Sequence, residues 1–521
     1  MRHAIRTSLR TLALTAVATL GMATTAWAQF DDKADEYFMS HCYERATERY
    51  LQVFGADKSN KANPALLRRI TESILRAEMA RDTARYFADL YLEFEQNDAE
   101  AYFMAAQAHF HAHDFDIALA RLDSFMVRTT TEEQLNRGEQ LNSWIRNAKR
   151  FMRDTLPNPL INLGEQINTK NNEFNPYIIN DGRTLIFSCD DKYDREAKIT
   201  IFNIKSSDQT ALSWSPAKKL GNQVNTLNDE YPSGVTPDGF FFCSNSGNGR
   251  DFSLYTAHYL DNGRGTQVEK MPRPIDRKGS VVSACLTESG DTIYFSACDK
   301  KGKLDIYYSI RSFNGTWMTP RPIPGLVNRD ESDENYPILD NNGTRLYFAS
   351  NREGSMGGYD IYYSDFDYRK NAWGVPVHLP YPINDTYDNM TVSFTEDHRY
   401  AYLSLFRDDS YGGRDIYALL LNHDVRTSAI IRYTVKVRNT KNKILDIRKQ
   451  PTIEVRDDYG ELVAIERVNM NNHSFIVVLD PGTYTLSIDL EGTKHYEEKI
   501  EIPERTYGTK AIDRKATLEV N

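Results

Sequence analysis

Apolar residues in the first third of the chain recur at helical spacing. From Asp31 to about Asp154 they return every three or four positions, and Gly and Pro are few. This spacing is typical of amphipathic helices, so the segment is predicted to be all helical. Two helices should meet at a turn near His113-Asp114, with Ala106 and Ala118 where the backbones approach most closely. A less regular pair is expected over Leu66–Met79 and Asp82–Phe94.

A different pattern begins after Pro157, where short β-branched and aromatic runs alternate with Asn, Asp and Gly clusters typical of strands and turns. One series of features recurs in the same order: an acidic residue, an aromatic-Pro step, an apolar strand ending in Ser, a Gly-rich turn and a second aromatic strand. The aromatic of that last strand recurs with steps of 53, 52, 55 and 55 residues, at Phe202, Tyr255, Tyr307, Tyr362 and Tyr417. A period of this size with about four short strands indicates β-propeller blades, so five blades are predicted.

The two ends of this repeat region are unequal. The final copy lacks a fourth strand, whereas the segment 158–164, before the first copy, has the pattern of a fourth strand without its blade. We expect this segment to complete the last blade, which removes the exposed strand edges that favour aggregation.

The C-terminal part alternates apolar and polar residues again, for example at Tyr433, Val435 and Val437. About seven short strands in some 90 residues favour a small β-sandwich. The predicted fold class is therefore multidomain: an α-helical repeat domain over 29–156, a five-bladed β-propeller over 157–425 and a small β-sandwich over 426–521. A length of 521 residues has room for about three or four domains, which agrees with this division.

The first 28 residues have the pattern of an export signal. A positive start with Arg2, Arg6 and Arg10 precedes an apolar stretch, and Ala26-Trp27-Ala28 offers small residues before Gln29. We expect cleavage after Ala28 and a periplasmic location. Any association of the protein with the outer membrane is expected to arise through partners. No later stretch approaches ~18 uninterrupted apolar residues, so no membrane span is expected. The net charge of −10 has the wrong sign for a nucleic-acid binder.

Charged residues at the starts of the innermost strands are the candidate site. Glu173, Asp229, Glu334 and Asp388 stand there, and Val281 occupies the aligned position of the third blade. Together the carboxylates could rim a central channel and attract a basic peptide or a cation. In the alternative interpretation each carboxylate caps its own turn.

Several other observations argue against an enzyme. The sequence has no Gly-x-Ser-x-Gly elbow, no His-Glu-x-x-His and no phosphate-binding Gly loop, so neither catalytic residues nor a metal or cofactor are expected. The five cysteines show no metal-ligand spacing. Buried free thiols are the favoured interpretation of them, with up to two disulfides as the alternative.

Three parts of the chain resemble known families. The helices around Ala106 and Ala118 resemble a tetratricopeptide repeat, which implies either a peptide-docking groove or a helical cap. The element Gly-Gly-Tyr-Asp-Ile-Tyr-Tyr-Ser over 357–364 resembles the WD-like repeats of TolB propellers, although those are described with six blades. The Pro-Gly-x-Tyr-x-Leu element at 481–486 is similar to carboxypeptidase regulatory-like domains.

This order of modules behind an export signal resembles PorE-like periplasmic proteins of the type IX secretion system. The resemblance implies envelope or secretion-system proteins as partners. Neither an OmpA-like peptidoglycan-binding domain nor a lipid-anchored cysteine is found in the sequence, so direct cell-wall binding and lipid anchoring are not expected. We therefore expect a non-enzymatic periplasmic adaptor. A propeller that binds a glycan or small ligand at its channel mouth is the alternative.

Overall fold

The computed structural model of the chain describes most residues after the predicted export signal, and residues 1–28 lie outside the described part. The described residues are 31–78, 81–153, 160–179, 182–194, 196, 199–210, 213–236, 239–245, 251–257, 267–277, 279–299, 301–340, 343–395, 400–421, 429–470, 472–479, 481–503 and 512–520.

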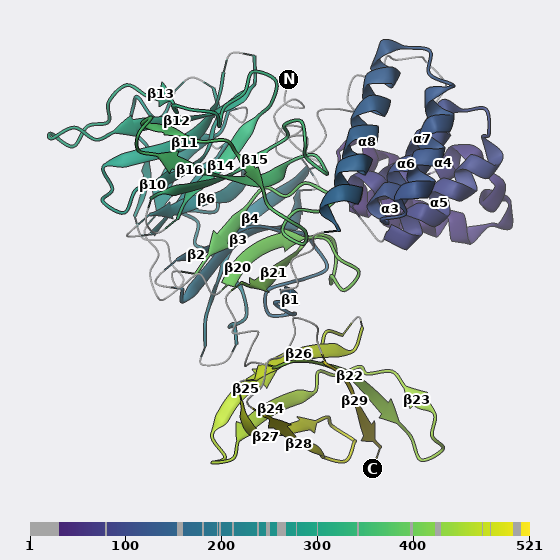
Figure 1. Ribbon diagram of the computed structural model, residues 1–521. Coiled ribbons are helices and arrows are strands. Elements are labelled where there is room, and N and C mark those ends of the chain that lie inside the picture. Colours follow the sequence, from purple (N-terminus) through teal and green to yellow (C-terminus); the bar gives the residue numbers. More distant parts are fainter. Residues whose placement is uncertain are drawn as a thin grey trace. The chain divides into compact units, whose positions relative to one another are not determined.

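The N-terminal part is helical, as predicted (Figure 1). Its elements are α2 (Asp32–Met39), α3 (Tyr43–Ala56), the short 3-10 helix η1 (Lys58–Ala62), α4 (Pro64–Ala77), α5 (Arg81–Phe94), α6 (Ala99–His111), α7 (Phe115–Met126) and α8 (Glu132–Phe151). The Asn63 side chain caps α4 by accepting from the Leu66 N–H, and Pro64 has the fixed φ that suits a first turn. Ala106 and Ala118 are fully buried, which confirms the predicted close approach of α6 and α7.

Strands follow from residue 160 to residue 420. They are β1 (Leu160–Asn162), β2 (Glu173–Ile179), β3 (Thr184–Asp194), β4 (Ile199–Asp208), β5 (Lys218–Lys219), β6 (Glu230–Thr236), β7 (Gly239–Ser244), β8 (Ser253–Ala257), β9 (Val268–Lys270), β10 (Val281–Leu286), β11 (Thr292–Cys298), β12 (Leu304–Ile310), β13 (Arg321–Pro322), β14 (Glu334–Leu339), β15 (Arg345–Ser350), β16 (Asp360–Asp367), β17 (Ala372–Trp373), β18 (Val377–His378), β19 (Val392–Phe394), β20 (Tyr400–Leu405) and β21 (Asp415–Leu420).

The described strands of this region form five sheets, which we number along the chain (Figure 1). The first sheet is β2-β3-β4-β5, the second β6-β7-β8-β9 and the third β10-β11-β12-β13. The fourth is β14-β15-β16-β17, with β18 also on β16, and the fifth is β19-β20-β21-β1. All five recurrent aromatics lie on the third strand of their sheet, and Tyr255, Tyr307, Tyr362 and Tyr417 face the fourth strand in register. The first copy corrects the alignment made from the sequence, because the Leu220 N–H donates to Ile204 O as the Ile323 and Leu379 N–H groups donate to Ile306 O and Ile361 O. Lys205, not Phe202, is therefore the structural counterpart of the other four aromatics.

The early strand β1 pairs with the late strand β21, as the sequence predicts. Asn162 faces Tyr417 in this pair, and in the fourth sheet His378 of β18 faces Tyr362 in the same way. Strand β1 therefore takes the position of a fourth strand although it precedes the other strands of its sheet by more than two hundred residues.

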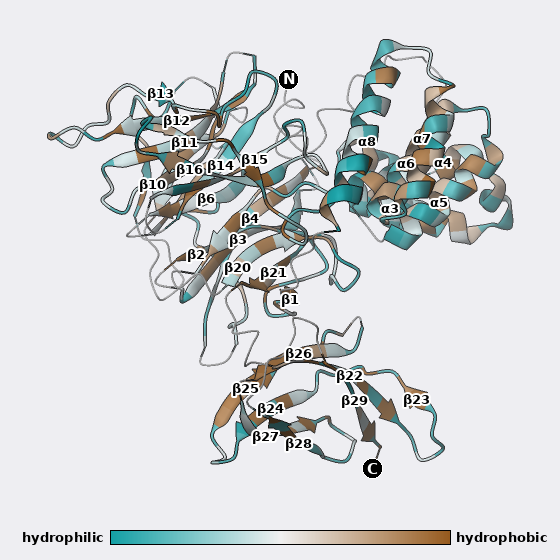
Figure 2. Cartoon of the chain, in the orientation of Figure 1, coloured by the Kyte–Doolittle hydropathy of each residue, from teal (hydrophilic) through white to brown (hydrophobic). Residues whose placement is uncertain are grey.

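The C-terminal strands form two further sheets. Their members are β22 (Ala429–Arg438), β23 (Ile444–Leu445), β24 (Thr452–Asp457), β25 (Leu462–Glu466), β26 (Ser474–Leu479), β27 (Gly482–Asp489), β28 (Tyr496–Ile502) and β29 (Ile512–Glu519). Strand β22 pairs with β23, β26 and, in parallel, with β29, while the other sheet has the order β25-β24-β27-β28. Hydrophobic residues recur along these strands (Figure 2), and Tyr433, Val435 and Val437 are buried as predicted.

By contacts the chain divides into two compact units. One comprises Met1–Leu156, Phe187–Ile204 and Lys219–Thr391, and the other Pro157–Ile186, Lys205–Lys218 and Val392–Asn521. All five cysteines are free thiols, which confirms the favoured interpretation. Burial raises the pKa of Cys285 and Cys298 to about 12, so these thiols stay protonated near neutral pH. Among the described helices, none is long and apolar enough to cross a membrane.

Candidate functional site at the starts of the innermost strands

All four candidate carboxylates are buried. Glu173 and Glu334 are the first residues of β2 and β14, Asp229 directly precedes β6, and Asp388 precedes β19. None exposes more than 4% of its surface. The structure divides them between two positions that differ by one residue, which corrects the alignment made from the sequence.

The first position is a glutamate that closes the loop before its own strand. Thr169 donates to Glu173 from Oγ1 at 2.7 Å and from its backbone N–H at 3.2 Å. Thr226 binds Glu230 in the same way, at 2.5 and 3.0 Å. Glu230, not Asp229, is therefore the counterpart of Glu173. The missed signal was a threonine four residues before the glutamate in both copies.

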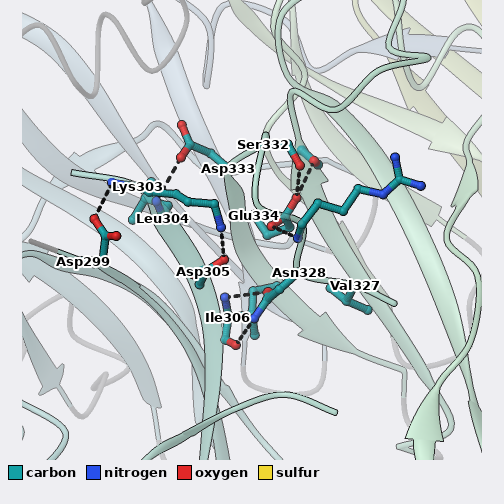
Figure 3. Close-up of polar contacts among 12 residues, drawn as sticks. Asp299, Lys303, Leu304, Asp305, Ile306, Val327, Asn328, Ser332, Asp333 and Glu334 are labelled. Atoms are coloured by element: carbon teal, nitrogen blue, oxygen red, sulfur yellow. Dashed lines mark hydrogen bonds and ion pairs between the residues drawn. The ribbon is translucent and has the colours of Figure 1, made fainter. Parts of the chain in front are cut away.

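Glu334 occupies this position in the fourth sheet and has more donors. Its carboxylate accepts from Ser332 Oγ at 2.6 Å, from the Arg329 N–H at 3.1 Å and from Ser350 Oγ at 3.0 Å (Figure 3). The buried Arg352 guanidinium also lies 3.1 Å away. Burial raises the pKa of Glu334, and the Ser332 hydroxyl and the Arg352 cation oppose that shift.

The second position joins one sheet to the next. Asp229 Oδ1 accepts from the Phe202 N–H at 3.3 Å, and Asp388 Oδ1 accepts from the Tyr359 N–H at 2.7 Å. In both pairs the donor lies at the third strand of the preceding sheet. The remaining three contacts of this kind are from Leu304 N to Asp333 Oδ1 (2.9 Å, Figure 3), from Phe252 N to Ser280 Oγ (3.1 Å) and from Arg414 N to Asn172 Oδ1 (2.9 Å).

An asparagine in the loop before each of four of these strands makes a second link that the sequence analysis missed. Its side-chain amide accepts from the N–H and donates to the C=O of one isoleucine on the preceding sheet, at 2.7 to 3.0 Å. The pairs are Asn225 with Ile204, Asn328 with Ile306, Asn384 with Ile361 and Asn168 with Ile416. Figure 3 shows the pair of Asn328 and Ile306. The available signal was an asparagine four or five residues before the acidic position.

The chemistry of the site follows from these bonds. The carboxylates accept hydrogen bonds from the chain's own N–H and O–H groups, so they hold loops closed and sheets together. Burial raises the pKa of Glu230 to about 7 despite its three hydrogen bonds. Within the described part of the chain, no three His, Cys, Asp or Glu side chains are grouped so that they could hold a metal ion.

Asp360 and Asp415, which precede the recurrent Ile-Tyr step, also act as turn caps. Asp360 Oδ2 accepts from the Met356 N–H at 2.6 Å, and Asp415 Oδ2 accepts from the Tyr411 N–H at 2.9 Å. Each of these aspartates therefore stabilises a tight turn of its own sheet. The partner at the fourth strand differs between the two, being His378 for Asp360 and Asn162 for Asp415.

Comparison with known proteins gives likenesses of structure only. No known family and no curated protein matches the sequence. A thermostable family-43 glycoside hydrolase is 15% identical over 50% of this chain and 92% of its own, with a TM-score of 0.35. TolB from Acinetobacter baumannii is 15% identical over 51% of this chain and 55% of its own, with a TM-score of 0.29. The periplasmic gluconolactonase of Pseudomonas aeruginosa is 12% identical over 64% and 86%, with a TM-score of 0.25. At these values none of them assigns a function to this chain.

Proposed function

We propose that the protein is a non-enzymatic periplasmic adaptor whose five-bladed propeller forms a rigid platform for other envelope proteins. This proposal rests on the observation that the buried acidic residues form hydrogen bonds within the protein. Glu173, Glu230 and Glu334 each close a loop, and Asp229 and Asp388 each join two sheets. Groups engaged in this way hold the frame together and do not converge on a substrate.

The links between consecutive sheets support the proposed ring of five blades. Four of the inter-sheet bonds connect the first sheet to the second, and so on to the fifth, and the bond from Arg414 to Asn172 connects the fifth to the first. Strand β1 supplies the missing fourth strand. A ring closed in this way leaves only short, protected edges.

Exposed apolar side chains on the outer strands of the third and fourth sheets support a protein-binding role. Phe313 is fully exposed at the tip of a hairpin. Further exposed apolar residues of these sheets are Ile310, Met318, Tyr368, Val375 and Val377. Phe313 is therefore the side chain that we choose to test for partner binding.

The glycan-binding alternative has no observation in its favour. Three tryptophans, Trp214, Trp317 and Trp373, recur in the outer part of the repeats. Trp317 and Trp373 are buried at 9% and 2% exposure, and Trp214 is half-buried, so they do not form an exposed aromatic face. We therefore retain the adaptor and, from the resemblance to PorE-like proteins, propose envelope or secretion-system proteins as its partners.

The test is cross-linking of the tagged full chain in intact cells, followed by reconstitution with each purified partner. We expect at least one envelope protein to bind directly, with an affinity that falls in Phe313→Ser and is unchanged in Asn222→Ala. Failure to recover any specific envelope protein, together with retention on a glycan array, would overturn the proposal.

A further inference from the structure

The loop between the second and third strands has the same construction in the fourth and fifth sheets. In the fourth sheet, the Ser355 N–H donates to Arg352 O at 3.1 Å, and Ser355 Oγ lies 3.0 Å from the Tyr362 hydroxyl. In the fifth, the Ser410 N–H donates to Arg407 O at 3.0 Å, and Ser410 Oγ lies 3.1 Å from the Tyr417 hydroxyl.

Each loop is thus held by atoms of its own sheet. The caps from Asp360 and Asp415 complete the construction by binding the N–H of the residue after the serine. That residue is Met356 in the fourth sheet and Tyr411 in the fifth. The two loops thus share these hydrogen bonds and differ in the side chain after the serine, and also at the preceding position, where Gly354 corresponds to Asp409.

Met356 is buried among helices. It is fully buried and belongs to one hydrophobic cluster with residues of α6, α7 and α8. Its helical neighbours in this cluster are Phe103, Ala106, Phe110, Ala118, Leu122, Phe125, Leu141, Ile145 and Ala148. Asn147 of α8 donates from Nδ2 to Ser355 O at 2.9 Å, directly beside Met356.

Two stacked ring pairs flank this contact. Phe151 at the end of α8 stacks on His378, with centroids 4.1 Å apart and planes at 17°. His111 at the end of α6 stacks on Tyr387, with centroids 4.3 Å apart and planes at 7°. The helices are therefore seated on the fourth sheet over a continuous, mostly apolar contact.

The loop of the fifth sheet contacts the C-terminal sheets instead. Asn469, between β25 and β26, donates from Nδ2 to Asp409 O at 2.8 Å. Tyr411, two residues further along this loop, is half-buried, and burial raises its pKa. Arg467 forms an ion pair with Glu165 at 2.9 Å. This contact is polar where that of Met356 is apolar.

We propose that these two loops are docking elements for the flanking parts of the chain, and that the residue after the serine selects which part docks. Met356 packs in the apolar cluster of α6, α7 and α8, whereas the loop that carries Tyr411 contacts the polar segment 467–470 through Asp409. The helical part then acts as a cap fixed to the fourth sheet, since Met356 fills the helix surface next to α8. Of the two interpretations of the helices from the sequence, this proposal adopts the cap.

Hydrogen exchange of the full chain, read segment by segment, tests this proposal. Met356→Ser should raise the exchange of α6 and α8 at least tenfold, because a polar group replaces a buried apolar side chain, and leave β24 to β28 unchanged. Tyr411→Ser should raise the exchange of the segment 467–470 and β26 and leave the helices unchanged. Unchanged α6 and α8 in the first variant, or equal acceleration of both parts in either variant, overturns the proposal.

A milder pair of variants guards against global unfolding. Asn147→Ala removes the bond to Ser355 together with a long, exposed contact of 3.5 Å to Ser143 Oγ. It should raise the exchange at the end of α8 by about two- to tenfold, as the loss of one buried hydrogen bond implies. The matched control is Asn142→Ala on the same helix, which removes only the exposed bond to Arg146. Equal exchange in the two variants contradicts docking of the helices on this loop.

Discussion

Glu230 should make the second sheet less stable as the pH rises. Burial raises its pKa from an ordinary 4.5 to about 7. A carboxyl group whose pKa is raised on folding binds its proton more tightly in the folded state. Its contribution is therefore fully present below pH ~4.5, falls as the pH rises, and is lost once the pH passes about 7.

The size of the effect follows from the difference between the two pKa values. At ~1.4 kcal/mol per pH unit, it corresponds to about 3 kcal/mol of unfolding free energy between pH 4 and pH 8. Glu230→Gln removes this dependence because the amide stays neutral. Its oxygen can accept from the Thr226 N–H, and its NH2 group can donate to the hydroxyl of Ser244, which now donates to Glu230 at 3.0 Å. The Thr226 hydroxyl loses its acceptor, which reduces the expected gain at pH 8 to about 1 to 2 kcal/mol.

The measurement is the urea midpoint of the full chain at pH 5, 6, 7 and 8, with hydrogen exchange of β6 and β7 as the local readout. The matched control is Glu288→Gln, which removes an exposed carboxylate from a turn. We expect the Glu230→Gln profile to be flatter than that of the wild type and the control profile to be parallel to it. Parallel wild-type and Glu230→Gln profiles would refute the reasoning.

Three further substitutions test the frame by thermal or urea unfolding. Asn384→Ala should lower the free energy of unfolding by about 2 to 4 kcal/mol, because a buried N–H and a buried C=O lose their partner. Asn222→Ala, on an exposed turn, should be nearly neutral, and similar losses in the two variants would contradict the proposed link between sheets. Gly234→Ala should destabilise strongly, since a Cβ there would lie 1.8 Å from a carbonyl oxygen of the next sheet, whereas Gly55→Ala, with nothing within 4 Å, should be neutral or gain about 0.5 kcal/mol. Phe313→Ser should leave stability within about 0.5 kcal/mol, because the ring is fully exposed; a larger loss would show that the hairpin tip serves the fold instead of partner binding.

The periodic features of the fold could be predicted from the sequence because the same pattern of residues occurs in each repeat. Four of the five third-strand aromatics, the pairing of β1 with β21 and the alternation of Tyr433, Val435 and Val437 depend on local spacing and are observed. Phe202 was misaligned because an aromatic happens to stand three residues before the true counterpart, Lys205. The parallel pairing of β22 with β29 was not predicted, because more than seventy residues separate the two strands and spacing carries no information about such a pair.

The site was harder to predict for a physical reason. Asp229 and Glu230 are adjacent carboxylates, and a sequence pattern cannot say which of them points to its own loop and which to the neighbouring sheet. That choice depends on strand direction, since successive side chains along a strand point to opposite faces. The asparagine links escaped notice for a related reason, because amide side chains in loops are usually associated with turns.

The acidic residues between the sheets are explained by the need for a hydrogen-bond acceptor and less by the need for a charge. The backbone N–H at the start of each third strand points away from its own sheet, and a buried N–H without a partner is costly. Asp229, Asp333 and Asp388 meet this need with a carboxylate, but Ser280 and Asn172 meet it with neutral oxygens at similar distances. The shared property of the five positions is therefore an oxygen placed within hydrogen-bonding distance of the preceding sheet. These oxygens are all engaged by backbone N–H groups of the neighbouring sheet, which is the bond that a frame requires.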